Sequence, residues 1–228
     1  MRHWIVVPAA GAGRRLGGGL PKQYLDLVGA PVIRHTLRRL LLSRPTAVVV
    51  VLAAGDEHWP RLIDLDDPRI LTTQGGAERI DSVRAGLALL AGRAAPEDPV
   101  LVHDAVRPCV MPTDIAALLA ADHPQGAVLA APVADTLKRV DAQGRIIATE
   151  ARAGLWAAQT PQLCRYGVLV AALAEAQRRG REITDEAAAL EAAGLQPRVV
   201  HGRRDNIKIT WPGDLALAAA ILAAQEEA

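Results

Sequence analysis

The stretch Trp4-Ile5-Val6-Val7-Pro8-Ala9-Ala10-Gly11-Ala12-Gly13-Arg14-Arg15 is the part of the chain from which the fold can be worked out. Its first four residues are a short apolar run, rich in β-branched side chains, that predicts a buried strand. The loop that follows leaves the end of this strand, where open α/β sheets bind their ligands. Small residues at Ala9, Ala10, Gly11 and Gly13 let backbone N–H groups approach a phosphate or a base edge closely. We therefore expect a nucleotide site to begin here.

Two cationic side chains follow this loop, Arg15 and, within Pro21-Lys22-Gln23, Lys22. A nucleoside triphosphate needs such cations, because its charge must be held and then stabilised further in a transition state. Two common glycine motifs do not fit. Leu16 stands where the dinucleotide fingerprint has its third glycine, and Lys22 lacks the glycine and hydroxyl neighbours of the P-loop lysine. A glycine cluster alone is equally typical of a flexible strand-to-helix turn, so the prediction depends on the cations and on the rest of the chain.

The composition limits the class of protein. The 228 residues, half of them hydrophobic, can bury one substantial core without a linker, so we expect a single domain over residues 1–228. A net charge of +1 with scattered basic residues argues against nucleic-acid binding. Pro8 interrupts the first apolar run, which argues against a signal peptide or a membrane span. Cys109 and Cys164 show no metal-ligand or disulfide spacing, so we expect a reducing, cytoplasmic location.

Predicted strands alternate with predicted helices along most of the chain. The expected strands are 4–7, 46–54, 69–73, 99–102, 127–131, 196–201 and 206–210, and the expected helices are 31–43, 56–65, 78–93, 112–122, 166–179, 184–193 and 212–226. Thr184 is the expected N-cap of its helix. Such alternation is typical of an α/β fold with a doubly wound, mostly parallel sheet.

Residues 133–154 break this alternation. Residues 136–140 and 145–149, joined by Asp141-Ala142-Gln143-Gly144, predict a two-stranded hairpin that protrudes as an arm. A lone hairpin is barely stable in water, so the arm must cover its own domain or reach another subunit. Arg152, at the far end of this segment, would travel with it.

Further candidate residues follow two other predicted strands. Gly75-Gly76-Ala77 makes a second glycine turn, and Asp104 comes directly after the strand 99–102. A carboxylate at this position is typical of a metal-linked or sugar-hydroxyl contact. Alternatively, Asp104 caps a turn or pairs with Arg107. Its neighbour His103 is better explained as a packed residue than as a base.

Ordered motifs along the whole chain resemble those of the 2-C-methyl-D-erythritol 4-phosphate cytidylyltransferase family. The opening loop alone indicates only the wider sugar-nucleotidyltransferase fold, which is Rossmann-like. The motifs that carry the resemblance are P-A-A-G-x-G-R-R with P-K-Q-Y, G-G-x-E-R-x-D-S-V from Gly75, V-H-D-A-x-R-P from Val102, A-P-V-x-D-T-x-K-R from Ala131, T-P-Q from Thr160, I-T-D-E from Ile183 and D-N-I-K from Asp205.

The resemblance implies transfer of CMP from CTP to methylerythritol phosphate, release of pyrophosphate and a homodimer joined through the arm. It also implies Mg²⁺, held mainly by the CTP phosphates with Asp104 as a candidate contact. Arg15 and Lys22 would stabilise charge on the α-phosphate, while Asp104 and Arg107 would lie where ribose, metal and substrate hydroxyls converge. The implied nucleotide-binding residues are Ala9, Ala10, Gly11, Gly13, Gly75, Gly76, Ala77 and Ser82, and the implied holders of the acceptor are Thr136 and Arg152 from the partner's arm with Thr184 and Lys208.

The attacking phosphate is anionic at neutral pH, so this chemistry needs no general base among the six histidines. Three alternatives stay open at this stage. A cytidylyltransferase for another polyol phosphate, such as ribitol 5-phosphate, would share the CTP half of the site. A NAD-dependent Rossmann oxidoreductase is disfavoured by Leu16. An inert nucleotide-binding module is disfavoured because Arg15, Lys22, Asp104 and Lys208 are all present.

Overall fold

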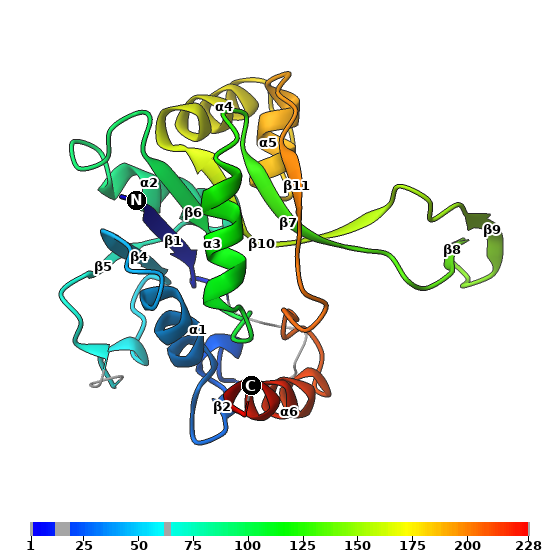
Figure 1. Ribbon diagram of the computed structural model, residues 1–228, viewed down its shortest axis with the longest axis horizontal. Helices are drawn as coiled ribbons and strands as arrows, with labels where there is room; N and C mark the ends of the chain where they lie inside the picture. The colour runs from blue at the N-terminus through cyan, green and yellow to red at the C-terminus, as the bar shows by residue number, and fades with distance from the viewer. Residues whose placement is uncertain (1, 12–18, 62–64, 228) are drawn as a thin grey trace.

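The molecule is built around one twisted sheet (Figure 1), and the computed structural model describes residues 2–11, 19–61 and 65–227. Within these residues the main sheet has seven strands in the order β11-β7-β10-β6-β1-β4-β5. They are β1 (Trp4–Pro8), β4 (Ala47–Leu52), β5 (Ile70–Gln74), β6 (Pro99–Val102), β7 (Ala127–Pro132), β10 (Trp156–Arg165) and β11 (Arg198–His201). Every pairing is parallel except those of β10, which runs against both β6 and β7. The predicted α/β fold with a mostly parallel sheet is confirmed.

Helices cover both faces of this sheet. They are α1 (Val32–Leu41), α2 (Arg79–Leu89), α3 (Pro112–Ala121), α4 (Tyr166–Arg178), α5 (Glu186–Ala192) and α6 (Asp214–Glu226). Alternate residues of β1 point to opposite sides: Ile5 and Val7 pack in the core that contains α1 and α3, whereas Trp4 and Val6 pack in the core that contains α2, α4 and α5. A strand buried on both faces must be apolar throughout, which is why residues 4–7 read as one continuous hydrophobic run.

A third, smaller core lies beneath α6. Leu27, from the short pair β2 (Asp26–Leu27) and β3 (Ala30–Pro31), packs there with Ile209 and Leu222. Two 3-10 turns, η2 (Lys22–Tyr24) and η3 (Trp59–Arg61), complete the body. Across the described residues, no helix is both apolar enough and long enough to cross a membrane.

The arm carries a separate two-stranded sheet of β8 (Leu137–Val140) and β9 (Ile146–Glu150), paired antiparallel. It lies at the end of a long extension that leaves the body from β7 and returns into β10 (Figure 1). Several of its large apolar side chains are exposed, including Val140, Ile146 and Ile147.

Four local predictions were wrong. The described part of 56–65 contains only the 3-10 turn η3, and 206–210 is irregular because its backbone bonds to the 104–107 loop and not to a sheet neighbour. The strand β10 was not predicted, since its alanines, glutamines and Pro161 carry little strand signal. The N-cap of α5 is Asp185 and not Thr184: the Asp185 carboxylate accepts a hydrogen bond from the Ala188 amide at 2.9 Å.

Candidate active site

A cavity of about 300 Å³ opens where β1 and β6 end. β1 pairs with β4 on one side and β6 on the other, so the order of the strands reverses here. Ligands of doubly wound sheets bind at such a reversal. The residues that line the cavity are Pro8, Ala9, Ala10, Gly11, Lys22, Gln23, Gly76, Ala77, Glu78, Arg79, Ser82, Asp104, Ala105, Val106 and Lys208.

The opening loop forms one wall of this cavity and is fastened at its start. The Ala9 amide donates to the Val51 carbonyl at 2.8 Å, and the buried Gln23 side chain donates to the Ala9 carbonyl at 2.6 Å. Gln23 therefore ties the segment that carries Lys22 to the end of β1. The predicted site residues Gly13 and Arg15 lie outside the described residues, and their roles stay predictions.

The second glycine turn forms another wall, at the start of α2. A Cβ on Gly75 would lie 2.5 Å from Ser82 Oγ, and one on Gly76 would lie 2.4 Å from Asp81 Cβ. A side chain at either position would force a neighbour to shift, because the turn packs directly on the first turn of the helix. Gly76, Ala77 and Ser82 line the cavity, so the positive end of the α2 dipole is directed toward any phosphate bound there.

Asp104 lies at the floor of the cavity among three cations. Its Oδ1 is 3.2 Å from Arg79 Nε, and its Oδ2 is 2.9 Å from Lys208 Nζ and 3.6 Å from Arg107 Nε. Burial alone would raise the pKa of this carboxyl, but the charges of Arg79, Lys208 and Arg107 outweigh it and hold the pKa well below its ordinary value. Asp104 is therefore a fixed negative charge. The alternative in which it pairs with Arg107 is correct in part, since it pairs with two other cations as well.

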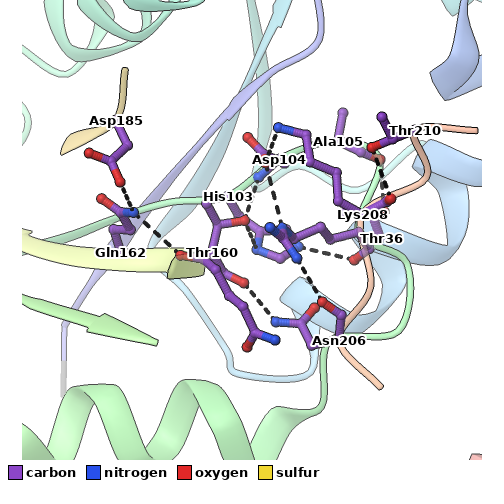
Figure 2. A network of polar contacts seen from close by, with 12 residues as sticks. Thr36, His103, Asp104, Ala105, Thr160, Gln162, Asp185, Asn206, Lys208 and Thr210 are labelled. Atoms are coloured by element: carbon purple, nitrogen blue, oxygen red, sulfur yellow. Dashed lines mark hydrogen bonds and ion pairs between the residues drawn. The ribbon is translucent and has the colours of Figure 1, made fainter. Parts of the chain in front are cut away.

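His103 supports this loop from beneath. Thr160 Oγ1 accepts from the Asp104 amide at 3.0 Å and lies 3.1 Å from His103 Nδ1, while His103 Nε2 lies 3.1 Å from the Arg107 carbonyl (Figure 2). A neutral imidazole protonated on Nε2 satisfies both contacts. Burial lowers the pKa of His103 to about 4, against weaker opposing contributions from its hydrogen bonds. The prediction that His103 is a packed residue is confirmed by its complete burial.

The segment 206–210 lies beside this loop and brings in the second lysine (Figure 2). The Arg107 guanidinium donates to the Asn206 carbonyl at 2.7 Å, and the Ile209 amide donates to the Val106 carbonyl at 2.9 Å. Lys208, nearly half exposed, is thereby placed against Asp104. Lys22 Nζ donates to the Thr210 carbonyl at 3.3 Å, so Lys22 bonds the segment that carries Lys208.

Sequence reasoning missed the pair formed by Arg79 and Glu186. Arg79 Nη1 and Nη2 donate to the two carboxylate oxygens of Glu186 at 2.7 and 3.1 Å, and its Nε donates to Asp104. Both residues lie inside the motifs G-G-x-E-R and I-T-D-E quoted above. Membership of these motifs was the one indication in the sequence that the two residues belong to the site. Their pairing is a tertiary contact between α2 and α5, which no local pattern reveals.

The predicted site residues do not all meet at the cavity. Lys22, Asp104, Lys208, Ser82 and the described small residues of the two glycine turns line it or pack on its wall. Arg107 lies deeper, with a largely buried side chain. Thr136 and Arg152 lie on the arm, where Arg152 donates to the Ala134 carbonyl, and Thr184 is exposed just before α5. None of these last four is among the residues that line the cavity.

The donor groups around the cavity do not make a protein cage for a metal. Among the residues that the structure describes, no three His, Cys, Asp or Glu side chains are grouped to hold one. Both Asp104 oxygens already face cations. A divalent ion at this site would therefore have to be held mainly by phosphate oxygens, as Mg²⁺ often is.

The two bare backbone turns and the N-terminus of α2 suit a nucleotide's phosphates, and the lysines beside them suit transfer of a phosphoryl group, as in a nucleotidyltransferase. The sequence profile described as IspD, 2-C-methyl-D-erythritol 4-phosphate cytidylyltransferase, matches residues 3–224. The chain therefore belongs to the 2-C-methyl-D-erythritol 4-phosphate cytidylyltransferase family.

Individual relatives cover nearly the whole chain. It is 52% identical over 230 residues to the 2-C-methyl-D-erythritol 4-phosphate cytidylyltransferase of Dechloromonas aromatica, covering 99% of each chain. A crystal structure of 4-diphosphocytidyl-2C-methyl-D-erythritol synthase has 37% identity and a TM-score of 0.83, covering 97% of this chain and 98% of that one. The Francisella tularensis family member has 32% identity and a TM-score of 0.84, covering 97% and 100%.

Proposed function

We propose that this enzyme transfers CMP from CTP to 2-C-methyl-D-erythritol 4-phosphate and releases pyrophosphate, a step of non-mevalonate isoprenoid biosynthesis. The observation that carries the proposal is the meeting of Lys22, Lys208 and Asp104 beside two bare backbone turns at one cavity. The family to which the chain belongs supports the choice of substrates.

In this proposal the two glycine turns and Ser82 hold the nucleotide. Lys22, together with the predicted contribution of Arg15, stabilises the charge that develops on the α-phosphate during in-line attack. Lys208, fixed by Asp104, positions the acceptor phosphate. That phosphate is already anionic at neutral pH, so the neutral, buried His103 is not required as a base.

We also propose that Mg²⁺ enters with CTP. Bound to the phosphates, it would offset their negative charge. Because Asp104 faces Arg79 and Lys208, the protein's own contribution is to place cations and backbone amides around the triphosphate.

We further propose a homodimer in which the arm reaches the other subunit. Val140, Ile146 and Ile147 are each more than half exposed, and an isolated two-stranded sheet is marginal in water. A second copy would cover these side chains, and Thr136 and Arg152 would then approach the partner's cavity. A reducing location such as the cytoplasm stays our prediction, supported by two buried, unpaired cysteines.

The direct test measures pyrophosphate release from CTP with and without methylerythritol phosphate, using ATP, GTP and UTP as nucleotide controls. We expect release only with CTP and the acceptor together. Equal turnover with ribitol 5-phosphate would favour the related polyol-phosphate transferase, and no acceptor-dependent release would refute the proposal.

A further inference from the structure

We propose that Glu186 and Arg79 are positioning residues that hold Asp104, and through it Lys208, in place for the acceptor phosphate. This inference rests on the proposed function and assigns a role to a buried ion pair that the mechanism above does not use. The pair, Asp104 and Lys208 form a continuous chain of alternating charge from α5 to the cavity.

Arg79 lines the cavity, yet its geometry does not suit it to bind phosphate. Each of its three guanidinium nitrogens already donates to a carboxylate: Nε to Asp104, and both terminal nitrogens to Glu186. A second bidentate partner has no edge of the guanidinium left to occupy. One N–H on each terminal nitrogen is left, and these two point to opposite sides of the guanidinium, so they do not form a bidentate edge. We therefore assign the effect of Arg79 on the reaction to its contact with Asp104.

Glu186 determines how Arg79 divides its contacts. The Glu186 side chain is fully buried, and it takes the terminal nitrogens of Arg79 in a bidentate pair. Only Nε is left for Asp104 Oδ1, so Asp104 Oδ2 can hold Lys208 at 2.9 Å. Without the charge of Glu186, Arg79 would compete for both Asp104 oxygens, because a guanidinium prefers a bidentate carboxylate. Lys208, nearly half exposed, would then be released from its place.

Substitution of Glu186 by glutamine removes this charge and keeps the shape. For Glu186→Gln we expect kcat to fall about 10-fold, less than for loss of a group that contacts the transition state directly. The KM for methylerythritol phosphate should rise, while the KM for CTP should change by less than about twofold because the glycine turns are untouched.

A second variant separates positioning from stability. Arg79→Met with Glu186→Leu replaces the pair by apolar side chains, which for buried ion pairs is often neutral or stabilising. Asp104 keeps Lys208 and Arg107 as partners, so we expect this double variant to fold with a Tm close to that of the wild type. It should still show low kcat and a raised acceptor KM, because Asp104 Oδ1 loses the Arg79 contact that fixes the carboxylate beneath Lys208. Adding Lys208→Ala should cost less there than in the wild type, because both changes disable the same contact.

Asp98→Asn is the matched control. Asp98 bonds Trp4 and the Ala95 amide before β6, at the opposite end of that strand from Asp104, so its loss should lower the Tm and leave kcat and both KM values unchanged. Recovery of wild-type turnover by the apolar double variant, or additive effects with Lys208→Ala, would overturn the inference alone. Absence of wild-type turnover on CTP and methylerythritol phosphate would overturn the proposed function and this inference with it.

Discussion

Acidification should destabilise this protein through the buried imidazole of His103. The ring is fully buried and satisfied in its neutral form, with a pKa of about 4, whereas an unfolded chain gives histidine its ordinary value of about 6.5. Between these two values the unfolded state binds more protons than the folded state. The free energy of unfolding therefore falls as the pH drops between these two values. Above and below them, the contribution of His103 to the free energy of unfolding is constant.

The expected size follows from the two pKa values. From near pH 7 to near pH 5 the contribution of His103 to the free energy of unfolding should fall by about 2 kcal/mol, and below pH 4 the full loss should reach about 3 kcal/mol. Other groups also titrate in acid, so the useful quantity is the difference between the wild type and a variant without this imidazole.

Urea unfolding at a series of pH values measures this difference. His103→Gln keeps a donor for the Arg107 carbonyl but cannot take up a proton, so its stability should depend less on pH by about 2 kcal/mol over the same interval. His201→Gln, the same substitution at an exposed histidine, is the control. If His103→Gln lost stability in acid as steeply as the wild type, the neutral buried imidazole would be refuted.

Further predictions concern the cavity, its wall and the arm. Lys22→Ala should lower kcat about 100-fold with CTP and the acceptor, and near-normal turnover would contradict its assignment. Gly76→Ala should lower the free energy of unfolding by about 1–3 kcal/mol in urea, because its Cβ would meet Asp81 Cβ at 2.4 Å; an unchanged midpoint would contradict this packing. Ile146→Asp with Ile147→Asp should give a monomer by sedimentation velocity, whereas an intact dimer would argue against the arm as the interface. EDTA should abolish turnover without changing the circular dichroism spectrum, and full turnover in EDTA would exclude a metal requirement.

The strands of the sheet could be predicted wherever burial on both faces leaves a continuous apolar run. Residues 4–7 and 47–52 are of this kind, and both strands lie where expected. The strand β10 could not be predicted, because its conformation depends on pairing with β6 and β7 and not on its own side chains. The segment 206–210 shows the opposite error. Its alternating apolar residues are typical of a strand, yet its partner is the loop after β6.

Some residues of the candidate site could likewise be predicted from the sequence, and others could not. Residues that must be small or charged directly after a strand, such as Gly76 and Asp104, could be found because their position in the chain limits which side chains fit there. Glu186 could not, since its contact with Arg79 exists only when the first turns of α5 and α2 come together in the folded chain. The sequence predicts Thr184 as the cap because hydroxyl residues favour that position, but the neighbouring Asp185 accepts the helix amide.

The arm leaves and re-enters the body at adjacent points. Pro132 and Trp156 are partners in the pairing of β7 with β10, and the Val133 amide bonds the Leu155 carbonyl at 3.1 Å. A tight turn could therefore replace residues 133–155 and leave the strand register of the body unchanged. Chimaeras that exchange residues 133–155 between family members should show which part of the enzyme determines acceptor specificity, the exchanged segment or the nucleotide-binding body.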